Sequence, residues 1–112
     1  MRQKKKNNNM KPTEDQIINE PAGRQLDAWA AEIVMGWDLD EDVLHPLFSV
    51  DIQAAWILVN RLIKDKNASC FGMNYYKGCY SFGFCNGQTK PKFIDAETAS
   101  LAITRAAILT KI

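Results

Sequence analysis

The chain has 112 residues, of which 46% are hydrophobic and 24% charged, and its formal net charge is +1. This composition is typical of one small globular domain, and no apolar run approaches the roughly 20 residues that a membrane-spanning helix needs. No apolar segment follows the basic N-terminal residues, so a secretory signal is not expected. We therefore expect a cytoplasmic protein that makes no contact with a membrane.

Positive charge is concentrated at the N-terminus, where residues 1–11 hold five basic side chains and no acid (Arg2, Lys4, Lys5, Lys6 and Lys11). All 13 acidic residues lie after residue 11, and they give the rest of the chain a charge of about −4. We predict a disordered basic tail over residues 1–16 and a single domain over residues 17–112. An acidic body disfavours a nucleic-acid-binding surface, so contact with nucleic acid is expected only through Lys4, Lys5 and Lys6.

The segment NEPAGRQLDAWAAEIVMG (19–36) has apolar residues at helical spacing. Pro21 suits the first turn of a helix, and Gly36 suits the left-handed position just after its end. Trp37 follows at a position where such caps place a hydrophobic residue. This favours a packing role for Trp37 over a role as the wall of a ligand site.

Residues 38–47 are predicted to form an acidic loop, because a helix cannot continue through Pro46. A second helix is expected after it, with Ser49 as the N-cap and Asp51 in the first turn. Its predicted apolar face consists of Ile52, Ala55, Trp56, Val59, Leu62 and Ile63.

The period then changes from 3.6 to 2 in CFGMNYYKGCYSFGFC (70–85), which predicts a β-hairpin with a two-residue turn at Lys77-Gly78. This register places Phe71 opposite Phe84 and leaves small residues, together with Tyr76, on the second face. We expect a second helical layer to cover that face; the alternative is an open face that forms the floor of a shallow pocket or pairs with a second copy. One face would hold all six large side chains (Phe71, Met73, Tyr75, Tyr80, Phe82 and Phe84).

The connection after the hairpin is rich in turn-forming residues, with a short extended piece expected at residues 92–94. Asp95 is expected to cap a final helix whose inward stripe consists mostly of alanine. The predicted fold class is therefore α/β (α+β): a compact layered helix–sheet–helix sandwich with the element order α-α-β-β-α and a small antiparallel hairpin sheet.

Three segments, EPAGRQLDAWAAEIVMGW, FSVDIQAAWILV and TASLAITRAAIL, resemble in this order the phage ABA-sandwich domain family of small phage and prophage proteins. The resemblance covers about residues 17–112. It implies a compact helix–sheet–helix fold, a location in the cytoplasm of an infected or lysogenic bacterial host, and no known catalytic activity. The acidic loop is shorter here than is usual in the family, so a function inherited through that loop is not expected.

The pattern of cysteine and histidine residues does not indicate a catalytic site or a metal site. Cys70, Cys79 and Cys85 are an odd number of thiols in a chain with no export signal, so they are expected to be reduced. Their spacing lacks the close pairs of a structural zinc site. The only histidine, His45, stands beside a proline in a loop, and nothing brings it to a cysteine. We therefore predict no enzyme, no metal and no cofactor.

A ligand site would gather Trp37, Tyr76 and Arg105, because aromatic side chains stack on a base and a guanidinium binds phosphate. For Arg105 a structural ion pair with Asp27 or Asp51 is favoured over ligand binding.

The function expected is that of a small non-enzymatic phage or prophage accessory protein that acts by binding. It would form a homo-oligomer, through sheet edges or helices, and bind a host protein or a small nucleotide. A narrower hypothesis is a counter-defence sponge that sequesters a nucleotide immune signal. The alternative is a protein–protein interaction or regulatory module whose basic tail contacts nucleic acid.

Overall fold

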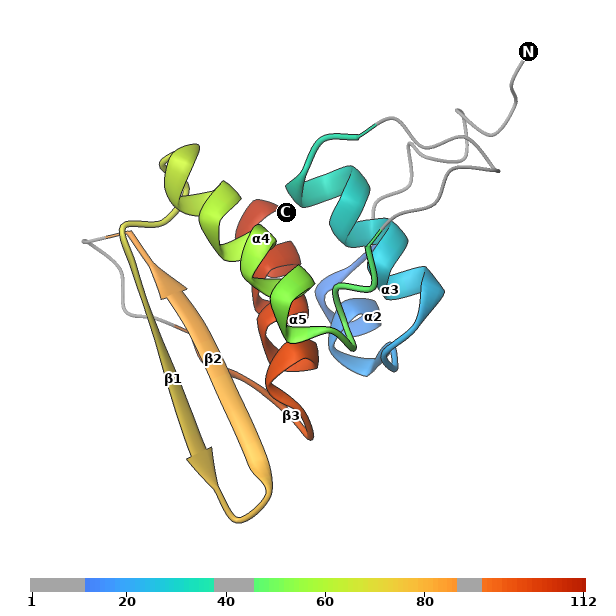
Figure 1. Ribbon diagram of the computed structural model, residues 1–112, viewed down its shortest axis with the longest axis vertical. Helices are drawn as coiled ribbons and strands as arrows, with labels where there is room; N and C mark the ends of the chain where they lie inside the picture. The colour runs from blue at the N-terminus through green and yellow to red at the C-terminus, as the bar shows by residue number, and fades with distance from the viewer. Residues whose placement is uncertain (1–11, 38–45, 87–91) are drawn as a thin grey trace.

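The structure is a computed structural model that describes residues 12–37, 46–86 and 92–112. Figure 1 shows a mixed α+β fold, which confirms the predicted class and the order of its main elements. The elements are α2 (Glu14–Asn19), α3 (Arg24–Trp29), the π-helical turn η1 (Ala30–Val34), α4 (Ile52–Lys64), β1 (Cys70–Tyr76), β2 (Cys79–Cys85), β3 (Ile94–Ala96) and α5 (Ala99–Lys111).

Helix α2 begins inside the segment that was predicted to be a disordered tail. The Thr13 hydroxyl accepts a hydrogen bond from the Gln16 N–H at 3.2 Å, and the Gln16 side chain accepts one from the Thr13 N–H at 2.8 Å. This reciprocal capping box fixes the first turn, and Ile17 anchors the helix in the core. The folded part therefore starts before residue 17, whereas residues 1–11, with Lys4, Lys5 and Lys6, lie outside the described residues.

The first predicted helix corresponds to α3 and η1, which follow each other without a break. It starts at Arg24 after Gly23 rather than at Pro21. Its end is as predicted: Gly36 has a φ of +73°, and the Trp37 N–H donates to the Ala31 carbonyl at 3.0 Å. This bond folds the chain back over the last turn, as a left-handed cap does.

Helix α4 is capped by Asp51, whose carboxylate accepts a hydrogen bond from the Gln53 N–H at 3.0 Å. Ser49, predicted to be the cap, is fully buried instead. Its hydroxyl accepts from the Gly23 N–H at 2.9 Å, and its own N–H donates to Asp27 at 2.7 Å. Ser49 therefore joins the start of α3 to the start of α4, an interaction between residues more than twenty positions apart.

The hairpin has the predicted register, from Phe71 opposite Phe84 to Tyr76 opposite Cys79. Lys77 (φ 49°) and Gly78 (φ 82°) are both left-handed, as a two-residue type I′ turn requires. A third strand, β3, pairs antiparallel with β2 and gives the sheet order β1-β2-β3.

Two predictions near β2 and β3 were wrong. Asp95 lies within β3, and α5 is capped by Thr98, whose hydroxyl accepts from the Leu101 N–H at 3.2 Å. Cys70 and Cys85 form a disulfide, while Cys79 is free. The register explains the bond, because it places these two residues opposite each other with their Cα atoms 5.4 Å apart, within the range that a disulfide spans.

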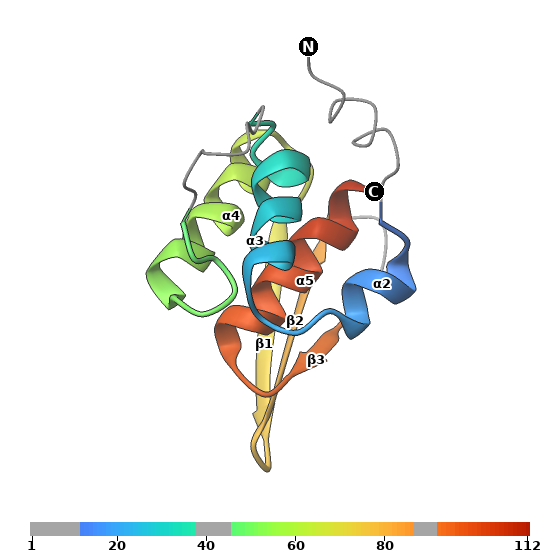
Figure 2. The ribbon, with the colours of Figure 1, turned by 90° about the vertical axis from the view of Figure 1, so that its right-hand side faces the viewer.

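Helix α5 lies at the centre of the molecule. Figures 1 and 2 show it between the sheet on one side and α2 and α3 on the other, with α4 beside it. Its alanine-rich sequence allows this close packing from several sides, and most of its residues are buried. The core on its sheet side includes Phe82, Phe84 and Ile94.

None of the helices among the described residues covers the small-residue face of the sheet, which corrects the expectation of a second helical layer there. Asn74, Tyr76 and Asp95 are exposed on it. Residues 92–93 lie against part of this face: a Cβ at Gly72 would lie 3.3 Å from the Phe93 ring, and one at Gly83 would lie 3.0 Å from the Lys92 carbonyl oxygen. Both helices that pack on the sheet, α4 and α5, lie on its aromatic side because the large side chains point there.

Candidate functional site: the exposed edge of β1

Strand β1 lies at the edge of the sheet formed by the described residues, where β2 is its only neighbour. Six of its seven residues are exposed. The exposed fractions are 41% for Phe71, 46% for Met73, 61% for Tyr75 and 72% for Tyr76. The strand sequence, CFGMNYY, contains no charged residue and no proline. Edge strands of monomeric proteins usually carry such residues to prevent pairing, so this edge lacks the common protection.

The end of β1 nearest the helices is held by aromatic packing. The Phe71 ring lies 5.4 Å from the Phe82 ring in a stacked arrangement and 5.5 Å from the Trp56 ring of α4. Towards the turn, Tyr75 contacts only its cross-strand neighbour Tyr80, at 4.8 Å, among the described ring pairs. The hairpin therefore projects beyond the helices with a rigid base and an aromatic, solvent-exposed outer half (Figure 1).

The backbone groups of β1 alternate between β2 and the open edge. A two-residue turn closes on a hydrogen-bonded pair, here Tyr76 and Cys79, and such pairs recur at every second residue. The 5.4 Å Cα separation of Cys70 and Cys85 agrees, because hydrogen-bonded pairs are about 5.5 Å apart. The N–H and C=O groups of Phe71, Met73 and Tyr75 therefore point to the open edge, away from β2.

The three residues predicted to form a ligand site are not joined by any contact among the described residues. Trp37 lies just after η1, is 38% exposed and packs against Phe48 with ring centres 6.3 Å apart, which matches its predicted role as a cap contact. Tyr76 lies at the turn of the hairpin, where the Lys77 ammonium is 5.3 Å from its ring centre. Arg105 lies in the middle of α5.

Arg105 connects three elements through backbone carbonyls. Its guanidinium donates to the Glu20 carbonyl at 2.8 Å and to the Asp95 carbonyl at 3.3 Å. Burial lowers the pKa of Arg105, against the opposing effect of the Glu97 and Glu20 carboxylates. Neither predicted partner is used. Asp27 is buried and accepts from Ser49, and Asp51 caps α4.

A hollow of about 260 Å³ lies between the end of β2, the start of β3 and the C-terminal half of α5. Several of its polar side chains already have partners. Lys92 pairs with Glu14, Asn67 accepts from Lys111 at 3.2 Å, and Thr110 donates to a carbonyl of its own helix at 2.8 Å. The described polar groups in this hollow therefore serve mainly to connect elements, and β1 remains the stronger candidate.

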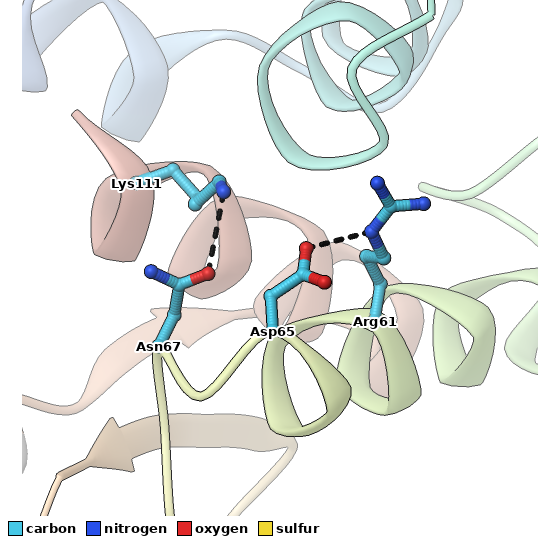
Figure 3. Close-up of polar contacts among 4 residues, drawn as sticks. All are labelled: Arg61, Asp65, Asn67 and Lys111. Atoms are coloured by element: carbon cyan, nitrogen blue, oxygen red, sulfur yellow. Dashed lines mark hydrogen bonds and ion pairs between the residues drawn. The ribbon is translucent and has the colours of Figure 1, made fainter.

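The link from Asn67 to Lys111 belongs to a small polar group at the end of α4 (Figure 3). There the Arg61 guanidinium donates to Asp65 at 2.7 Å, one turn later in the helix. This hydrogen bond lowers the pKa of the Asp65 carboxyl. Both interactions fix the segment that leads from α4 into β1.

Within the part of the chain that the structure describes, no three His, Cys, Asp or Glu side chains are grouped so that they could hold a metal ion. His45 lies outside that part. No helix among the described residues is long and apolar enough to cross a membrane.

The sequence indicated that a sheet edge could pair with another chain, but it placed Met73 and Tyr75 on a packed face. Their exposure follows from the length of the hairpin relative to the helices, which no local pattern reveals.

Comparison with known proteins gives a single finding. Residues 28–108 match the model of the phage ABA sandwich domain. No curated protein and no solved structure matches the chain.

Proposed function

The chain belongs to the phage ABA sandwich domain family, and we propose that it is a non-enzymatic phage protein that binds a protein partner by strand addition at the edge of β1. In this mode a strand of the partner extends the sheet, and its backbone pairs with the open N–H and C=O groups. The coarser part, a phage domain, rests on the family match over residues 28–108.

The observation that carries the proposal is the unprotected edge itself. Three exposed side chains, Phe71, Met73 and Tyr75, share the face that meets α4, and the backbone groups of the same residues point outward. An added strand would therefore gain backbone hydrogen bonds and apolar contacts at once. No charged side chain of β1 has to be desolvated in the process.

The narrower sponge hypothesis has less support. It relied on Arg105 to bind a phosphate, yet two donors of this guanidinium are used by the Glu20 and Asp95 carbonyls. A nucleotide would have to replace both interactions. Binding of a nucleotide immune signal therefore stays a prediction.

Strand addition can be tested by amide hydrogen exchange, residue by residue, on the full chain purified gently from a bacterial host. We expect the assembled protein to protect the amides of Phe71, Met73 and Tyr75 by at least about tenfold relative to the diluted protein. The amides of Gly72 and Asn74 already pair with β2 and should not change. Uniform exchange at all five positions in every assembly would refute the proposal.

Two variants control this experiment. Met73→Lys places a charge at the centre of the edge and should abolish the protection. Ile57→Lys removes a side chain of similar exposure, 41%, from α4 and should leave it intact. Native mass spectrometry of the same sample, followed by denaturation, reports any released nucleotide. If a nucleotide is released and the amides of Phe71, Met73 and Tyr75 exchange fast, the sponge hypothesis would be favoured instead.

A further inference from the structure

We propose that the partner strand is β1 of a second copy, paired antiparallel about a twofold axis at Met73, so that two sheets join into one of six strands. This inference rests on the proposed function, because it uses the same edge. It specifies the occupant and the register, and both follow from the backbone and side chains of β1.

The register about Met73 uses every outward backbone group of the strand. Met73 faces Met73 of the second copy, and Phe71 faces its Tyr75. All three are outward-facing residues, so the interface would contain about six backbone hydrogen bonds. Moving the twofold axis by one residue along the strand loses pairs, because Tyr75 would then have to pair with Ser69, whose N–H donates to Cys85, or Phe71 with Lys77 in the turn.

The side chains are self-complementary in the same register. On the aromatic face, Tyr75 of one copy lies beside Phe71 of the other, which is 41% exposed next to Trp56. Each copy would therefore cover the exposed part of the other's aromatic cluster.

On the opposite face, Gly72 lies across from Asn74 of the second copy, so no two large side chains compete for space there. The register also separates the charges. The strand has none, and the Lys77 side chains lie beyond the two ends of the paired segment. A twofold contact of this kind joins identical surfaces and closes at two copies, without the open-ended growth that an unprotected edge otherwise permits.

Disulfide cross-linking measures this register directly. Met73→Cys, made with Cys79→Ser so that Cys70 and Cys85 remain paired, places two thiols opposite each other within disulfide range. Tyr75→Cys in the same background is the matched control. Its side chain is more exposed, but the two copies of residue 75 would be about 13 Å apart along the strands.

We expect Met73→Cys to form covalent dimers at least about ten times faster than Tyr75→Cys at micromolar concentration, because only its thiols meet the geometric limit. Equal rates would overturn the register, because both variants would then be cross-linking through random collisions and not through a pair of thiols held opposite each other. Sedimentation equilibrium provides an independent measurement. The unmodified chain should be a dimer whose melting temperature rises with protein concentration. Met73→Lys should be a folded monomer whose melting temperature does not depend on concentration, because Met73 is half exposed and its replacement leaves the core intact.

The two proposals fail separately. A monomeric chain whose outward amides become protected only in a complex with a different protein would overturn the twofold dimer and keep strand addition. A dimer whose outward amides exchange fast would overturn both, since the contact would then lie elsewhere.

Discussion

Replacement of Arg105 by alanine tests whether this residue holds the fold together or serves a ligand. The guanidinium joins α5 to the Glu20 carbonyl after α2 and to the Asp95 carbonyl in β3. The partners are 85 and 10 residues apart in sequence, so the bond to Glu20 ties the end of α2 to α5 across most of the chain. We expect Arg105→Ala to lower stability and to leave self-association through β1 unchanged.

The magnitude follows from the two contacts. The bond to Glu20 is short, at 2.8 Å, and partly buried, so its loss should cost about 1.5 kcal/mol, as for other hydrogen bonds to a charged group. The bond to Asp95 is longer, at 3.3 Å, and exposed, and it should add about 0.5 kcal/mol. A loss of about 2 kcal/mol corresponds to a fall in melting temperature of roughly 8 to 12 °C for a domain of this size.

Urea unfolding, followed by tryptophan fluorescence, measures this loss. Arg105→Lys should recover about half of it, because one ammonium group cannot reach both carbonyls in the way that a planar guanidinium does. Arg61→Ala is the control: it removes an arginine whose partner, Asp65, lies at the surface, so it should lower stability much less than Arg105→Ala does. Unchanged stability of Arg105→Ala, together with a loss of nucleotide binding, would refute the structural role.

Three further predictions concern the sheet and the end of α4. Joint replacement of Cys70 and Cys85 by serine should lower the free energy of unfolding by up to about 3 kcal/mol, since the disulfide closes a loop of 15 residues. A reducing agent should destabilise the unmodified chain by the same amount and leave the variant unchanged. If the reducing agent affected both proteins equally, the prediction would be contradicted. Gly83→Ala should lower the free energy of unfolding in urea by about 1 to 3 kcal/mol, because the new Cβ meets the backbone carbonyl of residue 92. Gly72→Ala should cost less, because its new Cβ meets the Phe93 ring, which can move. The reverse order would be evidence against the described packing. The pKa of Asp65 is lowered below its ordinary value of 3.8, so its ion pair stabilises the fold above that pH and the contribution disappears as the pH falls through the lowered pKa. Asp65→Asn should therefore be less stable than the unmodified chain at pH 7, and the difference should shrink as the pH is lowered below 3.8, as measured by unfolding over a series of pH values. A difference that does not change with pH would show another cause.

Features that depend on neighbouring residues were predictable from the sequence. The alternation of large and small residues in 70–85 specifies the face of each side chain, and the Lys77-Gly78 turn then leaves one register that gathers the large ones. The left-handed cap at Gly36 and Trp37, just after η1, was predictable for the same reason, because such a cap involves only the last turn of the helix and the residues after it.

The disulfide could have been predicted by the same argument. One further pair along the predicted register joins Cys70 to Cys85. The expectation of reduced thiols prevailed because it was based on the cellular compartment, whereas the bond follows from the distance between two particular Cα atoms.

Tertiary structure decided the roles of two polar side chains in the body of the fold, Ser49 and Arg105. Ser49 looks like a helix cap in sequence, but the approach of α3 buries it against Gly23 and Asp27. Arg105 looks like an ion-pair partner, yet its position in α5 brings two backbone carbonyls within reach and neither predicted carboxylate.

The same distinction explains the candidate site. The sequence determined that β1 is an uncharged, aromatic strand of a hairpin, because these are properties of consecutive residues. Only the tertiary structure decided that β3 joins β2 and leaves β1 at the edge, and that the helices end short of Met73 and Tyr75. Those outcomes depend on which distant segments pack together and on how far each extends, and a pattern of neighbouring residues does not contain that information.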